Sequence, residues 1–157
     1  MGSQLRTIIE TLRSQIASSC NGSGSYNFDL RDSSGTQRVC IGTSLYPNTY
    51  PALMIQGIQR TSGETGQLTQ YRRSVSIDMH GYVSSTNDDP GEPILRAIDL
   101  ANDVELAIEA DPSIGSTVET VIMDYTALDG AEYNLEQGHG FVAIRLVATY
   151  RENRGEA

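Results

Sequence analysis

Residues 74–150 decide the fold of this chain, and they open with the segment SVSIDMHGYV at residues 74–83. Its odd positions carry apolar residues, with Gly81 in register, and its even positions carry mostly polar ones. A strict two-residue alternation predicts a β-strand that buries one face and exposes the other. We therefore expect a long, half-buried strand over residues 69–83.

A helix is expected after this strand and the polar loop 84–91. We place it at about residues 92–110, with Asp88 or Asp89 as its cap and with acidic residues near its start that suit the helix dipole. The apolar positions that predict it recur at helical spacing, and they are Ile94, Leu95, Ile98, Ala101, Val104 and Ile108.

Two closing strands are expected downstream of the helix, at residues 118–126 and 141–150. A turn at residues 127–130 and a polar loop at 132–140 separate them. The strand at residues 141–150 is expected to place Val142, Ile144, Leu146, Ala148 and Tyr150 on one side.

The N-terminal part of the chain predicts a second helix and a hairpin. Ser3 is expected to cap the helix, and residues 21–25 are expected to end it. Its apolar stripe consists of Leu5, Ile8, Ile9, Leu12 and Ile16. Residues 26–30 and 36–41 flank a polar turn, which predicts a β-hairpin.

Residues 52–59 predict a strand that is apolar on both faces. Leu53, Ile55 and Gly57 are expected on one face, and Met54 and Ile58 on the other. A strand with two apolar faces is typical of the interior of a sheet.

These elements predict an α+β fold, with a mixed or antiparallel β-sheet, an N-terminal helix and a second, central helix packed on one face, and a β-hairpin. The length of 157 residues favours a single domain over residues 1–157. The polar tail at residues 151–157 is expected to fray.

The net charge of the chain limits the kinds of partner that it is expected to bind. The formal net charge is −9, and all 11 positive residues are Arg. An acidic chain is a poor nonspecific ligand of nucleic acid, which needs clustered positive charge. The charge is compatible with a protein that lets DNA slide past without binding it.

The sequence also indicates the cellular compartment in which the protein is expected. Cys20 and Cys40 lack the spacing of a zinc site, and two free thiols in a cytosolic protein are favoured over a single disulfide. The N-terminus lacks the apolar segment of a signal peptide, and no apolar run approaches the length of a membrane span.

No residue pattern indicates catalysis. His80 and His139 are the only histidines and lie far apart in the sequence. The acidic cluster at residues 88–92 lacks the alternating ligands of a calcium-binding loop. The sequence contains no GxSxG nucleophile elbow, and its glycine-rich segment at residues 22–24 follows a helix, whereas a phosphate-binding loop precedes one. We expect no enzymatic activity, no cofactor and no metal.

Tyrosine is the dominant aromatic residue, with eight copies against two Phe and no Trp. Tyr50 and Tyr150 are among those expected at strand ends or in connectors. Such residues suit wet interfaces, and they suit the edge of a core equally well.

Taken in order, these segments resemble one protein family. They are the helix at residues 5–16, the segments 50–55 and 75–79, the helix at 100–108, the turn at 111–115 and the closing strand at 140–151. This order is similar to that of the tail terminator (tail-completion) proteins of long-tailed bacteriophages, the group that includes the lambda tail-completion protein U. The resemblance covers nearly the whole chain.

The resemblance implies a structural virion protein. Its α/β fold would form a hexameric ring on the head-proximal end of the tail tube, where the ring ends tube polymerisation and offers a surface for the head-side connector. The implied partners are other copies of the chain, the tail tube protein and the head–tail connector or stopper protein, with DNA passing through the ring unbound. The implied location is the tail or neck of the virion, assembled in the host cytoplasm. The alternatives are a head-side connector, stopper or adaptor, or a tube subunit, of the same particle.

A ring needs heterologous contacts, in which one surface patch meets a different patch on the neighbour. We predict that Arg72 and Arg73 meet Asp88, Asp89 or Glu92 of the next subunit, because their charges are opposite. Tyr50 and Tyr150 are further candidates for contacts between subunits. Six acidic copies are expected to give a lumen that repels DNA phosphates.

Overall fold

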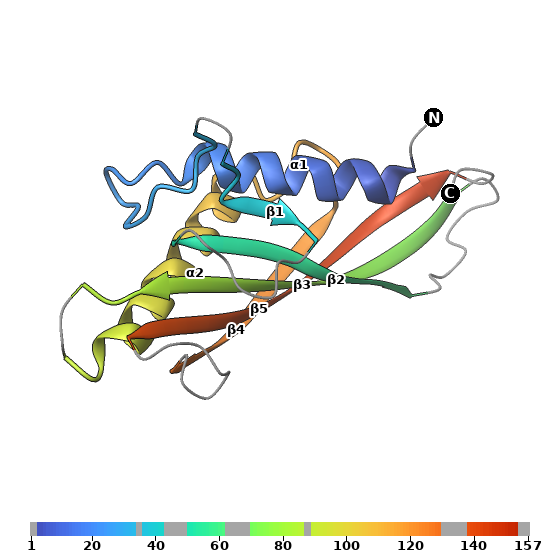
Figure 1. Cartoon of the computed structure of the whole chain (residues 1–157). Coiled ribbons are helices and arrows are strands. Elements are labelled where there is room, and N and C mark those ends of the chain that lie inside the picture. The colour runs from blue at the N-terminus through green and yellow to red at the C-terminus, as the bar shows by residue number, and fades with distance from the viewer. Residues whose placement is uncertain are drawn as a thin grey trace.

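The computed structural model describes residues 3–33, 36–42, 50–61, 70–86, 89–129 and 138–153. Two helices lie on one face of a five-stranded sheet with the strand order β1-β2-β3-β5-β4 (Figure 1). The elements are α1 (Gln4–Ser19), β1 (Val39–Ile41), β2 (Ala52–Thr61), β3 (Gln70–Ser84), α2 (Glu92–Ala110), β4 (Thr120–Asp129) and β5 (His139–Asn153). β1 pairs with β2 in parallel, and the other neighbours are antiparallel. The predicted α+β fold with a mixed sheet is confirmed.

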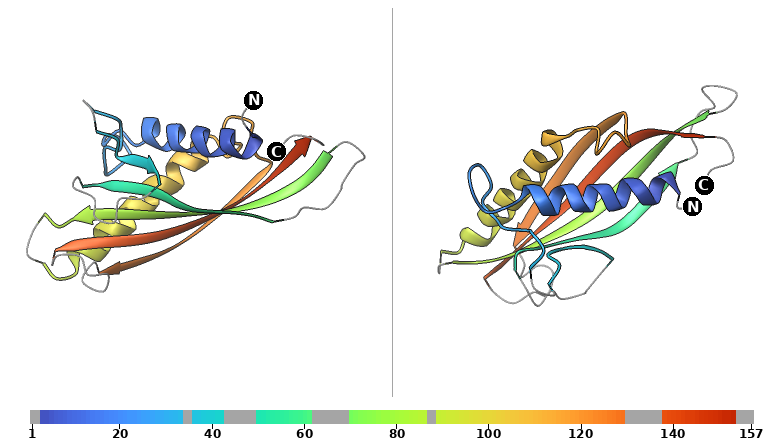
Figure 2. Two further views of the ribbon diagram at one scale, coloured as in Figure 1. Left: turned by 45° about the vertical axis from the view of Figure 1, so that its right-hand side comes forward. Right: turned by 90° about the horizontal axis from the view of Figure 1, so that it is seen from above.

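The core lies between the sheet and the two helices. On β3, Val75, Ile77 and Met79 are fully buried. The register places Ile77 opposite Leu146 and Met79 opposite Ile144 on β5, so the apolar faces of the two longest strands coincide. Seen from above, both helices overlie this face (Figure 2).

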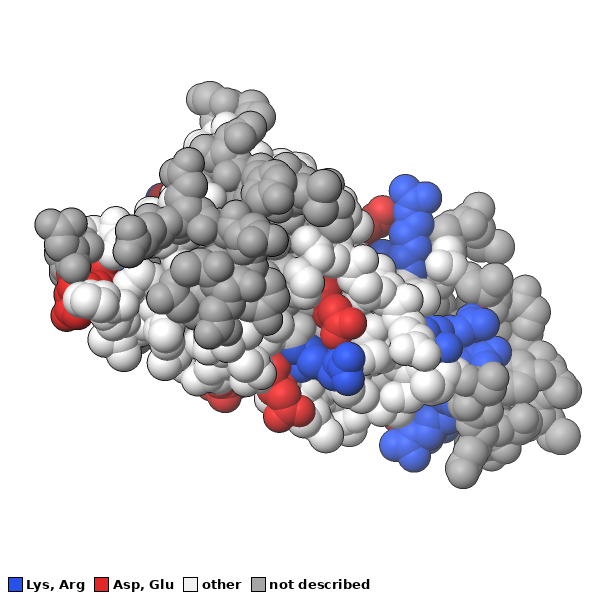
Figure 3. Space-filling model, turned by 60° about the horizontal axis from the view of Figure 1, so that its bottom comes forward, with Lys and Arg blue, Asp and Glu red and all other residues white. Residues whose placement is uncertain are grey.

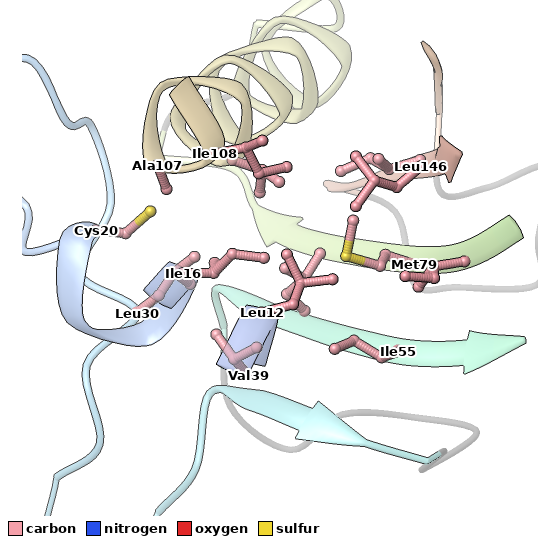
Figure 4. Packing of buried hydrophobic residues seen from close by; sticks show 14 of the residues in the cluster. Leu12, Ile16, Cys20, Leu30, Val39, Ile55, Met79, Ala107, Ile108 and Leu146 are labelled. Atoms are coloured by element: carbon pink, nitrogen blue, oxygen red, sulfur yellow. The ribbon is translucent and has the colours of Figure 1, made fainter. Parts of the chain in front are cut away.

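The helix α1 follows the prediction closely. The Ser3 Oγ accepts a hydrogen bond from the Arg6 N–H at 3.1 Å, and the helix ends at the C-cap Cys20. Leu12 and Ile16 point at Met79 and Ile55 of the sheet (Figure 4) and are fully buried. Burying each such side chain contributes about 1.5–3 kcal/mol.

The helix α2 has the predicted bounds but a different buried stripe. Leu95 is 58% exposed, whereas Ala97 and Ala101 are fully buried. Its N-cap is Gly91, which makes no capping bond through a side chain, so the predicted cap by Asp89 is wrong. The Asp89 carboxylate instead accepts the Gly91 N–H at 3.0 Å. The other predicted cap, Asp88, lies outside the described residues.

Small residues on both surfaces let α2 approach the sheet closely, which explains the rotated stripe. A Cβ added at Gly81 would lie 2.7 Å from the Leu100 side chain. A Cβ added at Gly140 would lie 2.1 Å from the Pro93 carbonyl oxygen, at the first turn of α2. The backbone of α2 therefore sits almost directly on Gly140.

We expect Gly140→Ala to lower the free energy of unfolding by at least about 2 kcal/mol, because the added methyl meets backbone that cannot rotate away. Urea denaturation followed by circular dichroism measures this loss. Gly91→Ala is the control, since Gly91 has φ −83° and its nearest neighbour to an added Cβ lies 3.7 Å away. Its effect should stay within about 0.5 kcal/mol. Equal effects at both sites would contradict the close approach.

The hairpin predicted at residues 26–30 and 36–41 is wrong. Residues 26–30 form no strand, and β1 pairs with β2 in parallel, from Val39 opposite Leu53 to Ile41 opposite Ile55. Phe28 is 5% exposed and Leu30 is fully buried, so the alternation reflects side chains that anchor an irregular segment on the core.

A buried carboxylate fixes that irregular segment. Asp103 on α2 has no exposed surface, and its carboxylate accepts the backbone N–H groups of Asn27 and Phe28 at 3.0 and 2.8 Å. It also accepts the Asn27 side-chain amide at 3.1 Å. Burial raises the pKa of Asp103, and the bonds from Asn27 and Phe28 act in the opposite direction. Burial also raises the pKa of the nearby Cys20 thiol to about 12.

We expect Asp103→Ala to lower the free energy of unfolding by about 2–4 kcal/mol, because the buried Phe28 N–H and the part-buried Asn27 N–H lose their acceptor. The matched control is Glu105→Ala, an exposed carboxylate two residues along the same helix, which should change stability by less than about 0.5 kcal/mol. Chemical denaturation of both variants gives the comparison. A loss at Asp103 no larger than at Glu105 would show that the carboxylate does not hold the segment.

The strands also depart from prediction at their ends. A register shift between Ile55 and Gly57 turns Ile58 to the face of Ile77, so its predicted placement beside Met54 is wrong. β4 continues to Asp129 in place of the predicted turn. β5 continues to Asn153, so the predicted fraying does not hold for residues 151–153. Residues 154–157 and 132–137 lie outside the described part of the chain.

Candidate interaction surfaces

One half of the sheet face opposite the helices is aromatic. Met54, Tyr82 and Phe141 form a small buried cluster there, with 7% exposure or less. The Tyr50 ring stacks on His139 at a centroid distance of 4.6 Å, and the His80 ring meets the Phe141 ring edge-on at 5.1 Å. Two histidines far apart in sequence therefore belong to one aromatic patch.

His80 is half-buried in this patch. Burial lowers the pKa of His80, with Asp78 acting in the opposite direction, and the lowered pKa favours the neutral imidazole. Within the described residues no group of three or more His, Cys, Asp or Glu side chains could hold a metal ion.

The other half of this face is polar and carries a row of charges across three strands. Arg145 lies between Asp78 and Asp124 in the register, and its Nε is 3.1 Å from the Asp78 carboxylate. In Figure 3 acidic, basic and acidic side chains follow one another across the middle of the molecule. They border an open hollow of about 450 Å³.

Basic side chains gather at one end of the sheet (Figure 3). Arg72 on β3 lies directly opposite Arg151 on β5, and both contact Glu119, at 3.6 and 2.5 Å. Like charges opposite each other destabilise a sheet, so Glu119 offsets a repulsion that the register imposes.

On the helix side of the same end, Arg60 and Arg73 share a second carboxylate, Glu152, at 3.4 and 3.0 Å. Glu152 is 1% exposed, so the carboxylate is buried and held by two guanidinium groups. We call Arg60, Arg72, Arg73 and Arg151 with Glu119 and Glu152 the arginine end. It carries net positive charge on a chain whose formal charge is −9.

The predicted contact residues differ in exposure and in their contacts within the chain. Arg72 and Asp89 are exposed. Arg73 is held by Glu152, and the Glu92 carboxylate accepts the Thr86 N–H at 2.7 Å and the Ser85 hydroxyl at 2.5 Å within the same chain.

Both predicted tyrosines also contact their own chain. Tyr150 is 1% exposed, and burial raises its pKa. Tyr50 is half-buried against His139.

Arg72 and Asp89 do not meet within one chain. They lie near opposite ends of β3, which at 3.3 Å per residue puts them roughly 40 Å apart. Contacts between these residues on neighbouring subunits stay a prediction. Asp88, the other acidic candidate of this loop, lies outside the described residues.

Three engaged carboxylates, Glu119, Glu152 and Asp103, were not predicted from the sequence. A charged residue between the apolar positions Ala101 and Val104 was a signal for a buried carboxylate at Asp103. Nothing in the sequence indicated Glu152, because its partner Arg73 is 79 residues away.

The chain matches no protein family model and no curated protein by sequence. Within the described residues, no helix combines the length and the apolar character that crossing a bilayer demands. Both cysteines are free, in agreement with the prediction.

The two carboxylates of the arginine end offer a matched comparison. We expect Glu152→Gln to lower the free energy of unfolding by about 3–5 kcal/mol, because Arg60 and Arg73 lose the buried carboxylate that they share. Glu119→Gln removes a carboxylate that is also shared by two arginines but is 34% exposed, and it should cost less than about 1 kcal/mol. Urea denaturation of both variants measures the loss in the free energy of unfolding. Similar losses for the two variants would show that the different burial of Glu152 and Glu119 does not affect stability.

Proposed function

We propose that this chain is a structural virion protein that forms a ring on the head-proximal end of a bacteriophage tail tube. The ring would end tube polymerisation and provide the surface for head–tail joining. The proposal is carried by the element order and its arrangement. A leading helix, a long strand, a central helix and closing strands are what the family resemblance implies, and both helices cover one face of the sheet.

The distribution of charge supports a head-to-tail contact between neighbours. The arginine end lies at one end of β3, and exposed Asp89 lies beyond the other end. A heterologous contact joins two different patches, and patches of opposite charge at opposite ends satisfy this requirement. Arg72 and Asp89 are the exposed members of the predicted pairing.

The net charge also suits a ring that DNA traverses. Six copies at −9 each would repel phosphates over a distance that salt limits to about 10 Å at 0.1 M. DNA would then pass without specific binding. A ring lined by the arginine ends would contradict this part of the proposal.

The decisive experiment is negative-stain electron microscopy of particles made without this chain. We expect overlong tubes without heads, because nothing halts polymerisation, and we expect the wild-type chain supplied in trans to restore normal tails. Tails of normal length that fail to join heads would assign the chain to the head-side connector. Absent tails would make it a tube or initiator component.

A charge reversal refines the same test. Arg72→Glu supplied in trans should restore normal tails less well than the wild type, because it removes the exposed cation of the predicted contact. Arg31→Glu makes the same charge change at a similarly exposed arginine outside the arginine end, and it should behave as the wild type. Equal restoration by both variants would reject the predicted pairing and leave the ring proposal standing.

A further inference from the structure

Among the described residues, the strand β4 forms one edge of the sheet. It pairs with β5 in unbroken register from Thr120 to Asp129 and, among the described strands, has no partner on its other side. Alternate residues of such a strand present their N–H and C=O groups outward. Among the described residues, no side chain forms a hydrogen bond with this outer edge.

The opposite edge of the sheet is protected, and β4 is not. β1 has three residues, and the Val39 carbonyl accepts a hydrogen bond from the Arg13 guanidinium at 2.9 Å. β4 has ten residues, and its sequence TVIMDYTALD contains neither Pro nor Lys. Short length, Pro, Lys and bulges are among the devices by which proteins protect sheet edges, and none of these four occurs in β4, whose middle carries one charged residue, Asp124.

β4 also exposes apolar side chains on both faces. Ile122 on the face away from the helices is 66% exposed, and Tyr125 on the helix side is 39% exposed. Val121 and Met123 are half-buried beside α2. An edge strand that is apolar on both faces is suited to pairing with another strand.

The strand that a second copy can offer is β4 itself, because at the other described edge β1 is short and protected, and β2 beyond Ile55 ends in the exposed polar residues Gln59, Arg60 and Thr61. A two-fold axis perpendicular to the sheet makes the two strands antiparallel and keeps the helices of both copies on one face. Residues directly opposite each other then share a face, so even-numbered residues meet even-numbered ones.

Charge selects the register. Pairing Asp124 with Asp124 would place two carboxylates directly opposite each other, which is unfavourable. Pairing about Tyr125 places Asp124 opposite Thr126, whose hydroxyl can donate to the carboxylate. It also places exposed Ile122 opposite Leu128 and Tyr125 opposite its own copy. In this register the side chains that face each other are chemically compatible on both faces of the sheet.

We propose that two copies of this chain associate through β4, antiparallel about Tyr125, so that their sheets become continuous. The contact goes beyond the proposed ring and does not rest on it. A two-fold contact closes on itself, whereas a ring is built from a different, heterologous pair of patches.

The charge of the chain sets the salt dependence of this contact. Exposed Glu105 and Glu109 on α2 border the groove beside β4, and each copy carries −9. Long-range repulsion therefore opposes association, and salt screens it. The dimer should become tighter as salt rises from about 0.05 to 0.5 M, whereas a contact held by opposite charges would weaken.

Disulfide trapping tests the register directly. In a Cys40→Ser background, with Cys20 fully buried, Tyr125→Cys should give a covalent dimer on mild oxidation. Residues directly opposite each other have Cβ atoms about 5 Å apart, which is close to the spacing a disulfide needs. Ile122→Cys is the matched control on the same strand, because the two copies of residue 122 would lie roughly 20 Å apart. Ile122→Cys combined with Leu128→Cys should restore cross-linking.

Sedimentation analysis tests association without a cross-link. The wild type should shift from monomer to dimer with rising concentration, and Ile122→Lys should weaken dimerisation at least tenfold. Ile41→Lys makes the same change at a 51% exposed residue of β1 and should leave the dimer intact. A wild type that stays monomeric at all salt concentrations, or an Ile122→Cys variant that cross-links as well as Tyr125→Cys, would overturn the proposal. A ring that persists in Ile122→Lys would leave the proposed function untouched.

Discussion

The pairing of β3 with β5 over fifteen residues is the interaction on which the rest of the structure depends. Its register aligns the buried positions of both strands under the two helices, with Ile77 opposite Leu146 at the centre. The same register determines the opposite face, where it places Asp78 beside Arg145 and Tyr82 beside Phe141. It also brings Arg72 against Arg151, a repulsion that Glu119 offsets. The charged row, the aromatic patch and the arginine end are thus consequences of one strand pairing.

Two buried carboxylates each hold together segments that are distant in the sequence. Asp103 fixes the segment around Asn27 and Phe28 to α2, and Glu152 fixes Arg60 and Arg73 at the end of the sheet. A buried carboxylate is costly unless its hydrogen bonds are satisfied, and here each has several donors. In both places local order depends on one ionisable side chain, so these two positions tolerate less change than the exposed carboxylates do.

The two proposed contacts depend on different interactions and involve different parts of the molecule. The ring contact would rely on charges at opposite ends of β3, and the two-fold contact on the open edge of β4. Salt acts on them in opposite directions, because it screens attraction in the first and repulsion in the second. A chain with both surfaces can hold its edge strand covered while it awaits assembly, and it can then join neighbours through its ends.

The sequence by itself determined the periodic elements. The bounds of α2, the capped start of α1 and the alternation of β3 follow from local spacing, which neighbours in the chain impose. Only the tertiary structure decided which strand β1 pairs with and which face of the sheet Ile58 occupies. Parallel pairing and a bulge both depend on strands that are distant in the sequence. It also decided the candidate surfaces. Arg72 could be placed near the start of a strand, but the partner of Arg73 is 79 residues away, and no local pattern encodes a register between such distant segments.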